Sequence, residues 1–167
     1  MKVFLIGLPG SGKSTLGPKL AEALNLPFFD LDHEIEKSEN LSISDIFSQK
    51  GEEYFRSAEN VSLKKLYDSH SNYLLATGGG TPCYHDAMSW MNATGVTIYL
   101  DTPIDVIVDR LRHKTDRPLL ANEKLEDKLQ KLFDDRSQIY QQNKITWSMK
   151  EQESPIAQLI EEIKKAV

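Results

Sequence analysis

A glycine-rich stretch near the start of the chain has the residue types needed to bind phosphate. Residues 7–14 read GLPGSGKS, which fits G-x-x-x-x-G-K-[ST] between an apolar run at 2–7 and an amphipathic run at 13–24. Glycines let the backbone curl so that successive N–H groups point inward, and a helix starting there adds the positive end of its dipole. Lys13 would then reach the β- and γ-phosphates, and the Ser14 hydroxyl would bind Mg²⁺. This pattern predicts a nucleotide-binding loop rather than an ordinary glycine-rich turn.

Two carboxylates lie in the next strand-like run, PFFDLD at 27–32. If Asp30 and Asp32 end a strand, both face the same side, at the edge where parallel sheets bind ligands. Two acids beside a phosphate-binding loop can divide the work. One can hold Mg²⁺ and its waters while the other faces a substrate hydroxyl. In the alternative interpretation, one or both acids simply start the next helix.

A run of three glycines and one arginine are candidates for contacts with a second substrate. Gly78, Gly79 and Gly80 follow an apolar strand-like run. Three glycines together favour close approach of the backbone to a ligand over a merely flexible loop. Arg136 falls on the apolar stripe of its expected helix, so it needs a charged partner. That partner is either an internal acid or the carboxylate of a substrate.

Two further arginines have more than one interpretation. Arg56 precedes Glu59 by one helical turn, so the acid can orient the guanidinium, although the pair alone would also fit an exposed helix face. Arg117 lies in a polar, proline-containing stretch at 112–124. There it would suit a mobile lid that closes on the transferring phosphoryl group, or it would be an ordinary surface arginine.

The elements that must position these residues alternate between strand-like and helical patterns. The expected strands are 2–7, 27–32, 73–80, 96–100 and 144–148, and the expected helices are 13–24, two over roughly 43–67, one over 103–111, 124–141 and 154–166. Alternating units with short connections predict an α/β fold, a parallel five-stranded sheet with helices on both faces. The chain shows no repeat and no linker, which predicts a single domain over 1–167.

Composition excludes several classes of partner. The chain has 167 residues with 20 Lys and Arg, 25 Asp and Glu, and a net charge of −5. This balance argues against a general nucleic-acid or anionic-membrane binder. A single cysteine excludes an internal disulfide and fits a reducing compartment. With no signal-peptide pattern and no long apolar run, we expect a cytoplasmic monomer acting on a small molecule.

The set of motifs resembles the shikimate kinase family, whose fold is the three-layer P-loop kinase sandwich of the nucleoside-monophosphate-kinase type. GLPGSGKST, DLD, GEEYFR, GGG, DRPLL and RSQIY occur in that family's order and at its approximate spacing, from the first strand to Tyr140. The resemblance implies phosphorylation of the 3-hydroxyl of shikimate with ATP and Mg²⁺, in the biosynthesis of aromatic amino acids. After Tyr140 the resemblance fades, because MKEQESP stands where family members often carry a basic nucleotide contact.

The resemblance also implies a role for each matching residue. It implies catalytic roles for Lys13, Asp32 and Arg117, and nucleotide contacts for Gly10, Ser11, Gly12, Lys13, Ser14, Thr15, Arg110 and Arg117. It implies Mg²⁺ contacts for Ser14 and Asp30, and shikimate contacts for Asp32, Arg56, Gly78, Gly79, Gly80 and Arg136 within a helical region at about 31–70 and beyond it. Arg110 would lie along the adenine, and the lid would span 112–124.

Three functions therefore compete. The first is a shikimate kinase, and the second is a kinase of the same architecture with another polyol acid, such as gluconate, as its acceptor. The third is a nucleotide-binding module without catalysis. The arginine pair Arg56 and Arg136, with the glycine run at 78–80, favours shikimate over another polyol acid. The intact Lys13, Ser14, Asp32 and Arg117 argue against a module that only binds nucleotide.

Overall fold

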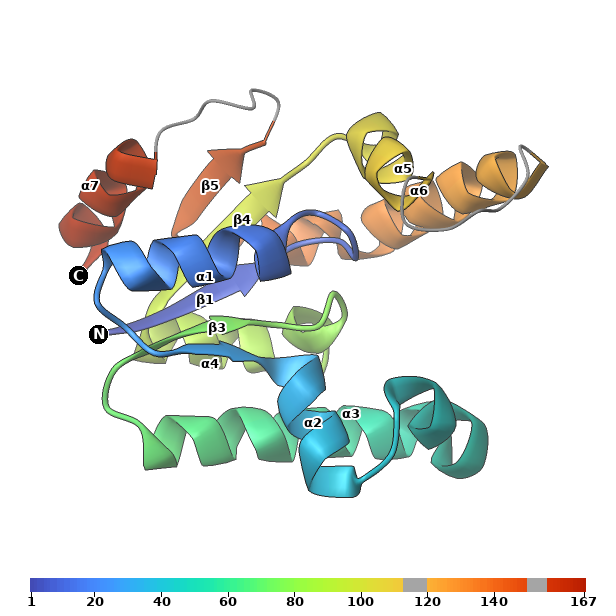
Figure 1. Cartoon of the computed structure of the whole chain (residues 1–167), viewed down its shortest axis with the longest axis horizontal. Helices are drawn as coiled ribbons and strands as arrows, with labels where there is room; N and C mark the ends of the chain where they lie inside the picture. The colour runs from blue at the N-terminus through green and yellow to red at the C-terminus, as the bar shows by residue number, and fades with distance from the viewer. Residues whose placement is uncertain (113–119, 150–155) are drawn as a thin grey trace.

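The computed structural model of the chain describes residues 1–112, 120–149 and 156–167 (Figure 1). Within them, one parallel sheet has the strand order β2 (Phe28–Asp30), β3 (Tyr73–Ala76), β1 (Lys2–Ile6), β4 (Val96–Asp101) and β5 (Ile145–Ser148). The central strand β1 pairs with β3, where Lys2 is the partner of Tyr73, and with β4, where Val3 is the partner of Val96. The predicted five-stranded parallel sheet is confirmed.

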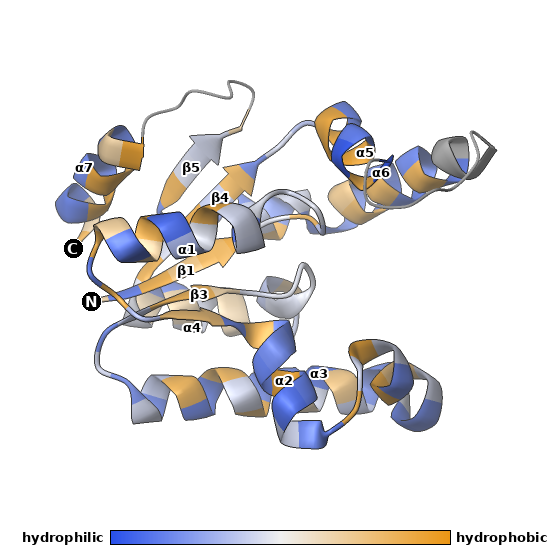
Figure 2. Cartoon of the chain, in the orientation of Figure 1, coloured by the Kyte–Doolittle hydropathy of each residue, from blue (hydrophilic) through white to orange (hydrophobic). Residues whose placement is uncertain are grey.

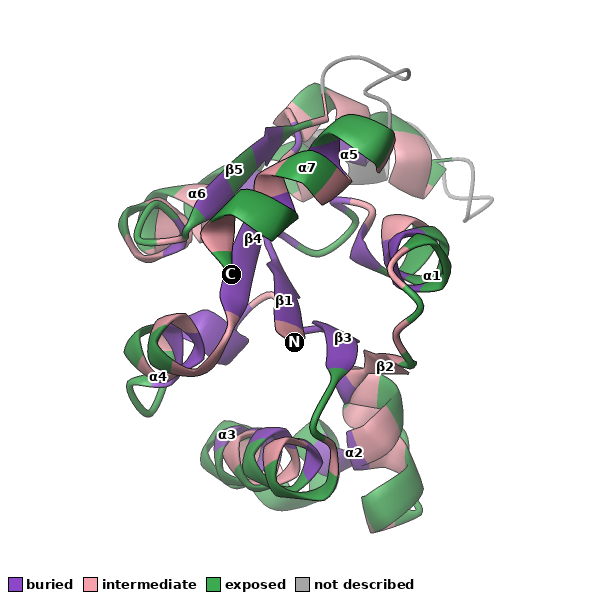
Figure 3. Cartoon of the chain, turned by 90° about the vertical axis from the view of Figure 1, so that its left-hand side faces the viewer, coloured by how far each residue is buried: buried purple, intermediate pink, exposed green. Residues whose placement is uncertain are grey.

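Helices connect the strands and cover both faces of the sheet. They are α1 (Lys13–Ala23), α2 (Leu31–Glu39), α3 (Ile43–Ser69), α4 (Ala87–Thr94), α5 (Ile104–Arg112), α6 (Leu120–Tyr140) and α7 (Ile156–Ala166), with a short 3₁₀ helix η1 (Thr81–Cys83). Figure 3 shows α1 and α7 on one side of the sheet and α3, α4 and α6 on the other. The expected three-layer arrangement is confirmed.

The side chains of β1 alternate between the two faces, which ties the layers together. Val3 and Leu5 pack into a cluster with side chains of α1 and α7, whereas Phe4 and Ile6 pack into a second cluster with side chains of α3, α4 and α6. All four are fully buried. Apolar residues are concentrated in the strands and on the inward sides of the helices (Figure 2). Burial on both faces explains why β1 is a continuous apolar run rather than an alternating one.

Helix α2 was not among the predicted helices, the first of which after the strand over 27–32 was expected at about residue 43. The strand ends at Asp30, whose carboxylate accepts a hydrogen bond from the Asp32 amide at 3.1 Å and caps the helix. The expected strand over 27–32 is therefore wrong at its end, because an aspartate that caps a helix ends the strand before it. Both acids belong to the start of α2, as the alternative interpretation stated.

Other boundaries also differ from the expected ones. Strand β3 ends at Ala76, so the expected strand over 73–80 is wrong at its end, because the glycine run leads into η1 instead of extending the sheet. Helix α5 extends to Arg112 and α6 begins at Leu120, so the expected loop over 112–124 is wrong at both ends. Residues 113–119, the middle of that loop, lie outside the described residues. Helix α3 is interrupted at Gly51, where the backbone is not helical, with φ of 83° and ψ of 172°. This kink separates two helical segments, in agreement with the two helices predicted over 43–67.

A helix that crosses a bilayer needs about 20 consecutive, mostly apolar residues. Within this part of the chain, no helix combines the length and the apolar character that crossing a membrane demands.

Candidate active site

The loop between β1 and α1 has the geometry of an anion-binding loop. Gly12, the residue before α1, has φ 107° and ψ 9°, a left-handed conformation that a side chain would strain. Within the described residues, the N–H groups of Gly12, Lys13 and Ser14 donate no hydrogen bond, whereas those of Thr15 and Leu16 donate to the Gly12 carbonyl. Unpaired amides at the N-terminus of a helix attract an anion such as a phosphate group.

The lysine of the loop is buried beneath these amides. Lys13 is 8% exposed, and its Nζ donates to the Gly7 and Leu8 carbonyls at 2.9 Å each. Burial lowers the pKa of Lys13 to about 8, although the charges of Asp32 and Asp30 oppose this shift. A cation held by neutral carbonyls in a dry setting gains strongly from an incoming anion.

A hydroxyl and a carboxylate meet at the ends of α1 and β2. Ser14 Oγ donates to Asp30 Oδ2 at 2.8 Å, and the other oxygen of this carboxylate caps α2. No group of three or more His, Cys, Asp or Glu within the described residues could hold a metal ion. A Mg²⁺ ion that keeps most of its waters and binds phosphate oxygens needs only one or two protein oxygens, and the Ser14–Asp30 pair fits that need.

Asp32 lies in a crowded, partly dry setting next to the glycine run. Burial, followed by the charges of Asp30 and Glu59, raises the pKa of Asp32 to about 6, although the charge of Lys13 opposes the shift. Asp32 Oδ1 is buried and has no hydrogen-bond partner within the described residues. It lies 3.1 Å from where a Cβ at Gly78 would sit. An acceptor left unpaired in a buried place points to a donor supplied by a ligand.

The guanidinium of Arg56 is fixed by two acids on the same helix. Arg56 is 9% exposed and donates from Nη1 to Glu59 Oε2 at 3.0 Å and from Nη2 to Glu52 Oε1 at 3.2 Å. Glu59, itself 2% exposed, also accepts a hydrogen bond from the Thr81 hydroxyl. The expectation that Glu59 orients Arg56 is confirmed, and the exposed-face alternative is wrong. A Cβ at Gly80 would lie 2.5 Å from Arg56 Nη1.

Arg136 reaches the same glycine run from α6. A Cβ at Gly79 would lie 3.3 Å from Nη1 of Arg136. The charge and hydrogen bonding of Arg136 lower the pKa of Tyr140, although burial raises this pKa by more. The Tyr140 hydroxyl donates to the Gly79 carbonyl. No ion pair joins Arg136 to an acid of the described residues. Of the two partners considered, an internal acid therefore finds no support in this part of the chain.

The three glycines are required for space rather than for backbone conformation. None of Gly78, Gly79 and Gly80 has a positive φ, yet a Cβ on each would come within 2.8 Å of another atom. Those atoms are Glu59 Oε1 at Gly78, Pro9 Cδ at Gly79 and Arg56 Nη1 at Gly80. The run thus allows three separate groups to close on one backbone turn.

Replacing Gly80 by alanine tests this close approach. The new Cβ would push the guanidinium of Arg56 by about 1 Å from the position in which the two acids hold it. A displacement of this size can lower the rate by up to about a hundredfold. We expect kcat/KM for the acceptor to fall by about ten- to a hundredfold, with KM for ATP unchanged. Steady-state kinetics measures both, and a variant with unaltered acceptor kinetics would contradict the close approach.

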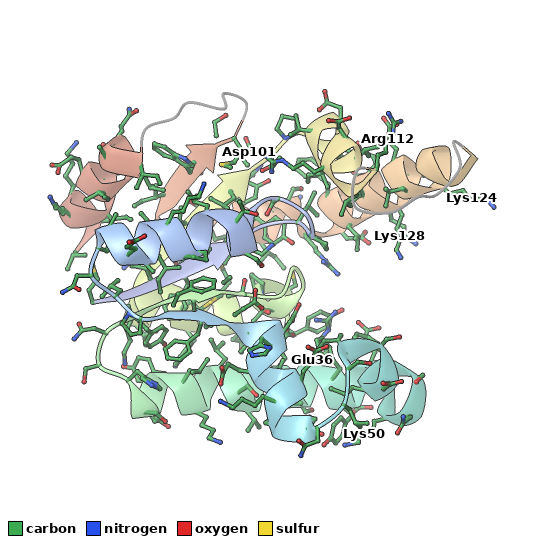
Figure 4. All side chains as sticks on the ribbon, viewed as in Figure 1. Glu36, Lys50, Asp101, Arg112, Lys124 and Lys128 are labelled. Carbon is green, nitrogen blue, oxygen red and sulfur yellow. The ribbon has the colours of Figure 1, made fainter. Side chains whose placement is uncertain are left out.

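Two side chains hydrogen-bond to the backbone of the phosphate loop. Arg110 donates from Nη1 to the Ser11 carbonyl at 3.0 Å, and Thr102 Oγ1 donates to the same oxygen at 2.8 Å. In this structure Arg110 therefore braces the phosphate loop, and its place along the adenine stays a prediction. Arg117 lies outside the described residues. Arg112, Lys124 and Lys128 are on α5 and α6, the helices that precede and follow residues 113–119 (Figure 4).

Most of the sequence-predicted residues meet at one edge of the sheet. The strand ends bring the phosphate loop, the start of α2, the glycine run, Arg56 and Arg136 together, as parallel topology requires. Thr102 and Tyr140 were not predicted as site residues, because each acts by a hydrogen bond to a backbone carbonyl that is distant in the sequence. Glu59 was predicted only as a partner of Arg56.

A phosphate loop at the carboxyl end of a central parallel strand, with a buried lysine and a hydroxyl–carboxylate pair, is typical of the P-loop NTPases, the class to which the P-loop kinases belong. A profile of the shikimate kinase family matches residues 9–167. The chain belongs to the shikimate kinase family. The resemblance seen in the sequence is confirmed, and the chain is an ATP-using kinase of that family rather than a module that only binds nucleotide.

Individual relatives agree with this assignment. The shikimate kinase of Aquifex aeolicus is 41% identical over 140 residues, which cover 84% of this chain and 82% of that protein. A crystal structure of the shikimate kinase from Bacteroides thetaiotaomicron has a TM-score of 0.85 at 34% identity, covering 99% of this chain and 95% of that one. The shikimate kinase from Acinetobacter baumannii in complex with shikimate has a TM-score of 0.83 at 34% identity, covering 98% and 90%.

Proposed function

We propose that the protein transfers the γ-phosphoryl group of ATP to the 3-hydroxyl of shikimate, giving shikimate 3-phosphate and ADP. The observation that carries this proposal is the meeting of Arg56 and Arg136 at Gly79 and Gly80, beside the unpaired oxygen of Asp32. A carboxylate with a hydroxyl across the same ring would engage the arginines and the aspartate together. The relative solved in complex with shikimate supports the choice of acceptor.

The loop residues would hold the nucleotide. The free amides at Gly12, Lys13 and Ser14 would donate to the phosphates, with Gly10, Ser11 and Thr15 completing the loop. Lys13 would exchange its carbonyl partners for phosphate oxygens, and Ser14 with Asp30 would hold Mg²⁺. The ion, when bound, neutralises charge on the β- and γ-phosphates. Arg110 and Arg117 are proposed as further nucleotide contacts, Arg117 on a lid over part of 112–124.

The acceptor would lie across from the phosphates. Arg56 and Arg136 would bind its carboxylate, and the carbonyls and amides of Gly78, Gly79 and Gly80 would border its ring. Asp32 Oδ1 would accept the hydrogen bond of the attacking hydroxyl and take its proton as the new O–P bond forms. A raised pKa suits this task, because a base works best when its pKa approaches the operating pH. The proposal also includes a cytoplasmic, monomeric enzyme.

An acceptor panel tests the function. We expect Mg²⁺-dependent ADP release from ATP with shikimate, and little with gluconate or nucleoside monophosphates. Nucleoside monophosphates have no carboxylate, and the open chain of gluconate does not hold its carboxylate and hydroxyls at a fixed separation, so binding it costs more conformational entropy. A coupled assay of ADP release at equal acceptor concentrations measures this. Turnover of gluconate at a rate equal to that of shikimate would reject the proposal in favour of the kinase with another polyol acid as its acceptor.

A further inference from the structure

An exposed aromatic ring lies against Arg56 and takes no part in the site described above. The ring centroid of Tyr84, which follows η1, is 4.3 Å from the Cζ atom of Arg56. The Tyr84 hydroxyl donates to Glu52 Oε1 at 3.3 Å, and the same oxygen accepts from Arg56 Nη2 at 3.2 Å and Nε at 3.4 Å. Tyr84, Glu52 and Arg56 therefore all contact one another. The tyrosine ring lies against the guanidinium, and the glutamate accepts hydrogen bonds from both of the other side chains.

The acids around Arg56 determine which of its N–H groups remain free to bind a ligand. A guanidinium has five N–H donors. Glu59 accepts one from Nη1, and Glu52 accepts one from Nη2 and the one on Nε. Within the described residues, one N–H on each terminal nitrogen is left over, and both of these nitrogens lie within 2.7 Å of the Cβ position at Gly80. Two remaining donors on adjacent nitrogens match a carboxylate.

The backbone after Tyr84 makes a left-handed turn. His85 and Asp86 both have left-handed conformations, with φ of 52° and 54°, which are uncommon outside glycine. The turn closes with a hydrogen bond from the Ala87 amide to the Tyr84 carbonyl at 3.0 Å. Tyr84 itself is 39% exposed, so core packing does not explain its position. This turn and its closing hydrogen bond fix the backbone on the C-terminal side of Tyr84.

We propose that Tyr84 is a positioning residue for acceptor recognition, which holds the guanidinium of Arg56, together with Glu52, so that its two remaining N–H groups face the acceptor's carboxylate. This inference rests on the proposed function, in which shikimate supplies that carboxylate. An arginine already held in place loses less side-chain freedom on binding, which increases affinity without a direct contact between Tyr84 and substrate.

Substitutions at Tyr84 separate the ring from the hydroxyl. We expect Tyr84→Ala to raise KM for shikimate about two- to fivefold, the effect of losing a partly exposed cation–π contact, with kcat and KM for ATP unchanged. Tyr84→Phe keeps the ring and should stay within about twofold of the parent. A merely structural role would instead lower the amount of active enzyme, and with it kcat, in both variants.

A matched control is available on α3. Tyr54 is 40% exposed, and the Lys50 ammonium lies 4.4 Å from its ring centroid, so Tyr54→Ala removes the same kind of contact from a different cation. Figure 4 shows Lys50 on the outer side of the α2–α3 region, away from the sheet. We expect Tyr54→Ala to leave KM for shikimate unchanged.

A double-mutant cycle decides whether the effect passes through Arg56. In an Arg56→Ala background, Tyr84→Ala should cause no further fall in kcat/KM for shikimate. An unchanged KM in Tyr84→Ala alone, or an equal loss with and without Arg56, would overturn the inference. Absence of shikimate turnover in the parent protein would instead reject the proposed function, so the two failures are distinguishable.

Discussion

Replacing Asp32 by asparagine is expected to remove most of the activity while making the protein more stable at neutral pH. Loss of a general base lowers kcat by about 10²–10⁴-fold, whereas ATP binding should survive. Stability moves the other way because the pKa of Asp32 is raised to about 6 by burial first and by Asp30 and Glu59 next. The ionised carboxylate therefore opposes folding.

The sign of the pH dependence follows from that shift. Between an unfolded pKa of 3.8 and a folded pKa of about 6, the folded protein keeps the proton on Asp32 and the unfolded chain has lost it. The free energy of unfolding therefore falls as pH rises through this window and stays lower above it. Two pKa units correspond to about 3 kcal/mol. Chemical denaturation should show Asp32→Asn more stable than the parent at pH 7, with the difference vanishing near pH 4.

Asp30→Asn is the matched control, since it changes the neighbouring carboxylate. Asp30 holds the Ser14 hydroxyl, so this variant should need more Mg²⁺ for half-maximal rate. Its kcat at saturating Mg²⁺ should fall less than that of Asp32→Asn. Identical kinetic changes in the two variants, or a destabilised Asp32→Asn, would contradict the division of labour between the two acids.

Arg136→Ala is expected to weaken shikimate binding with little cost in stability. No acid of the described residues pairs with Arg136, so its removal leaves no buried carboxylate behind in this part of the chain. Truncating one side of a charge pair with the substrate costs about 2–5 kcal/mol of binding. Calorimetric titration with shikimate and thermal melts on the same variant measure both quantities.

A control on the same helix separates this effect from overall charge. Lys128 is an exposed cation of α6, and Figure 4 shows it on that helix. Lys128→Ala removes the same charge and should leave shikimate affinity unchanged. A large drop in melting temperature for Arg136→Ala, with unaltered shikimate affinity, would remove Arg136 from the acceptor site.

The sequence predicted the parts of this site that depend on a local pattern or on burial. The phosphate loop follows from glycine, lysine and hydroxyl at fixed spacing, and Arg136 stands out because a charge falls on an apolar stripe. The start of α2 could not be predicted in the same way. The stretch around Asp30 is compatible both with a strand that continues to residue 32 and with a helix that Asp30 caps. Only the hydrogen bond from the Asp32 amide to the Asp30 carboxylate distinguishes the two.

Residues that act across the fold were harder to find. Tyr84 and Arg56 are well separated in sequence, and neither carries a pattern that connects them. Their contact depends on the turn made by η1 and on the left-handed His85 and Asp86. Tyr140 was visible only as part of the helix stripe, because its hydrogen bond to Gly79 depends on how α6 packs beside the sheet. No short sequence motif predicts packing between residues that are this far apart in the chain.

The central place of β1 in the sheet also affects how the protein is made. Lys2 pairs with Tyr73 and Val3 with Val96, so both neighbours of β1 are synthesised much later than β1 itself. A chain emerging from the ribosome therefore exposes the apolar run Val3–Ile6 throughout that interval. Since the phosphate loop is anchored on β1, ATP cannot stabilise the nascent chain before β3 and β4 have emerged.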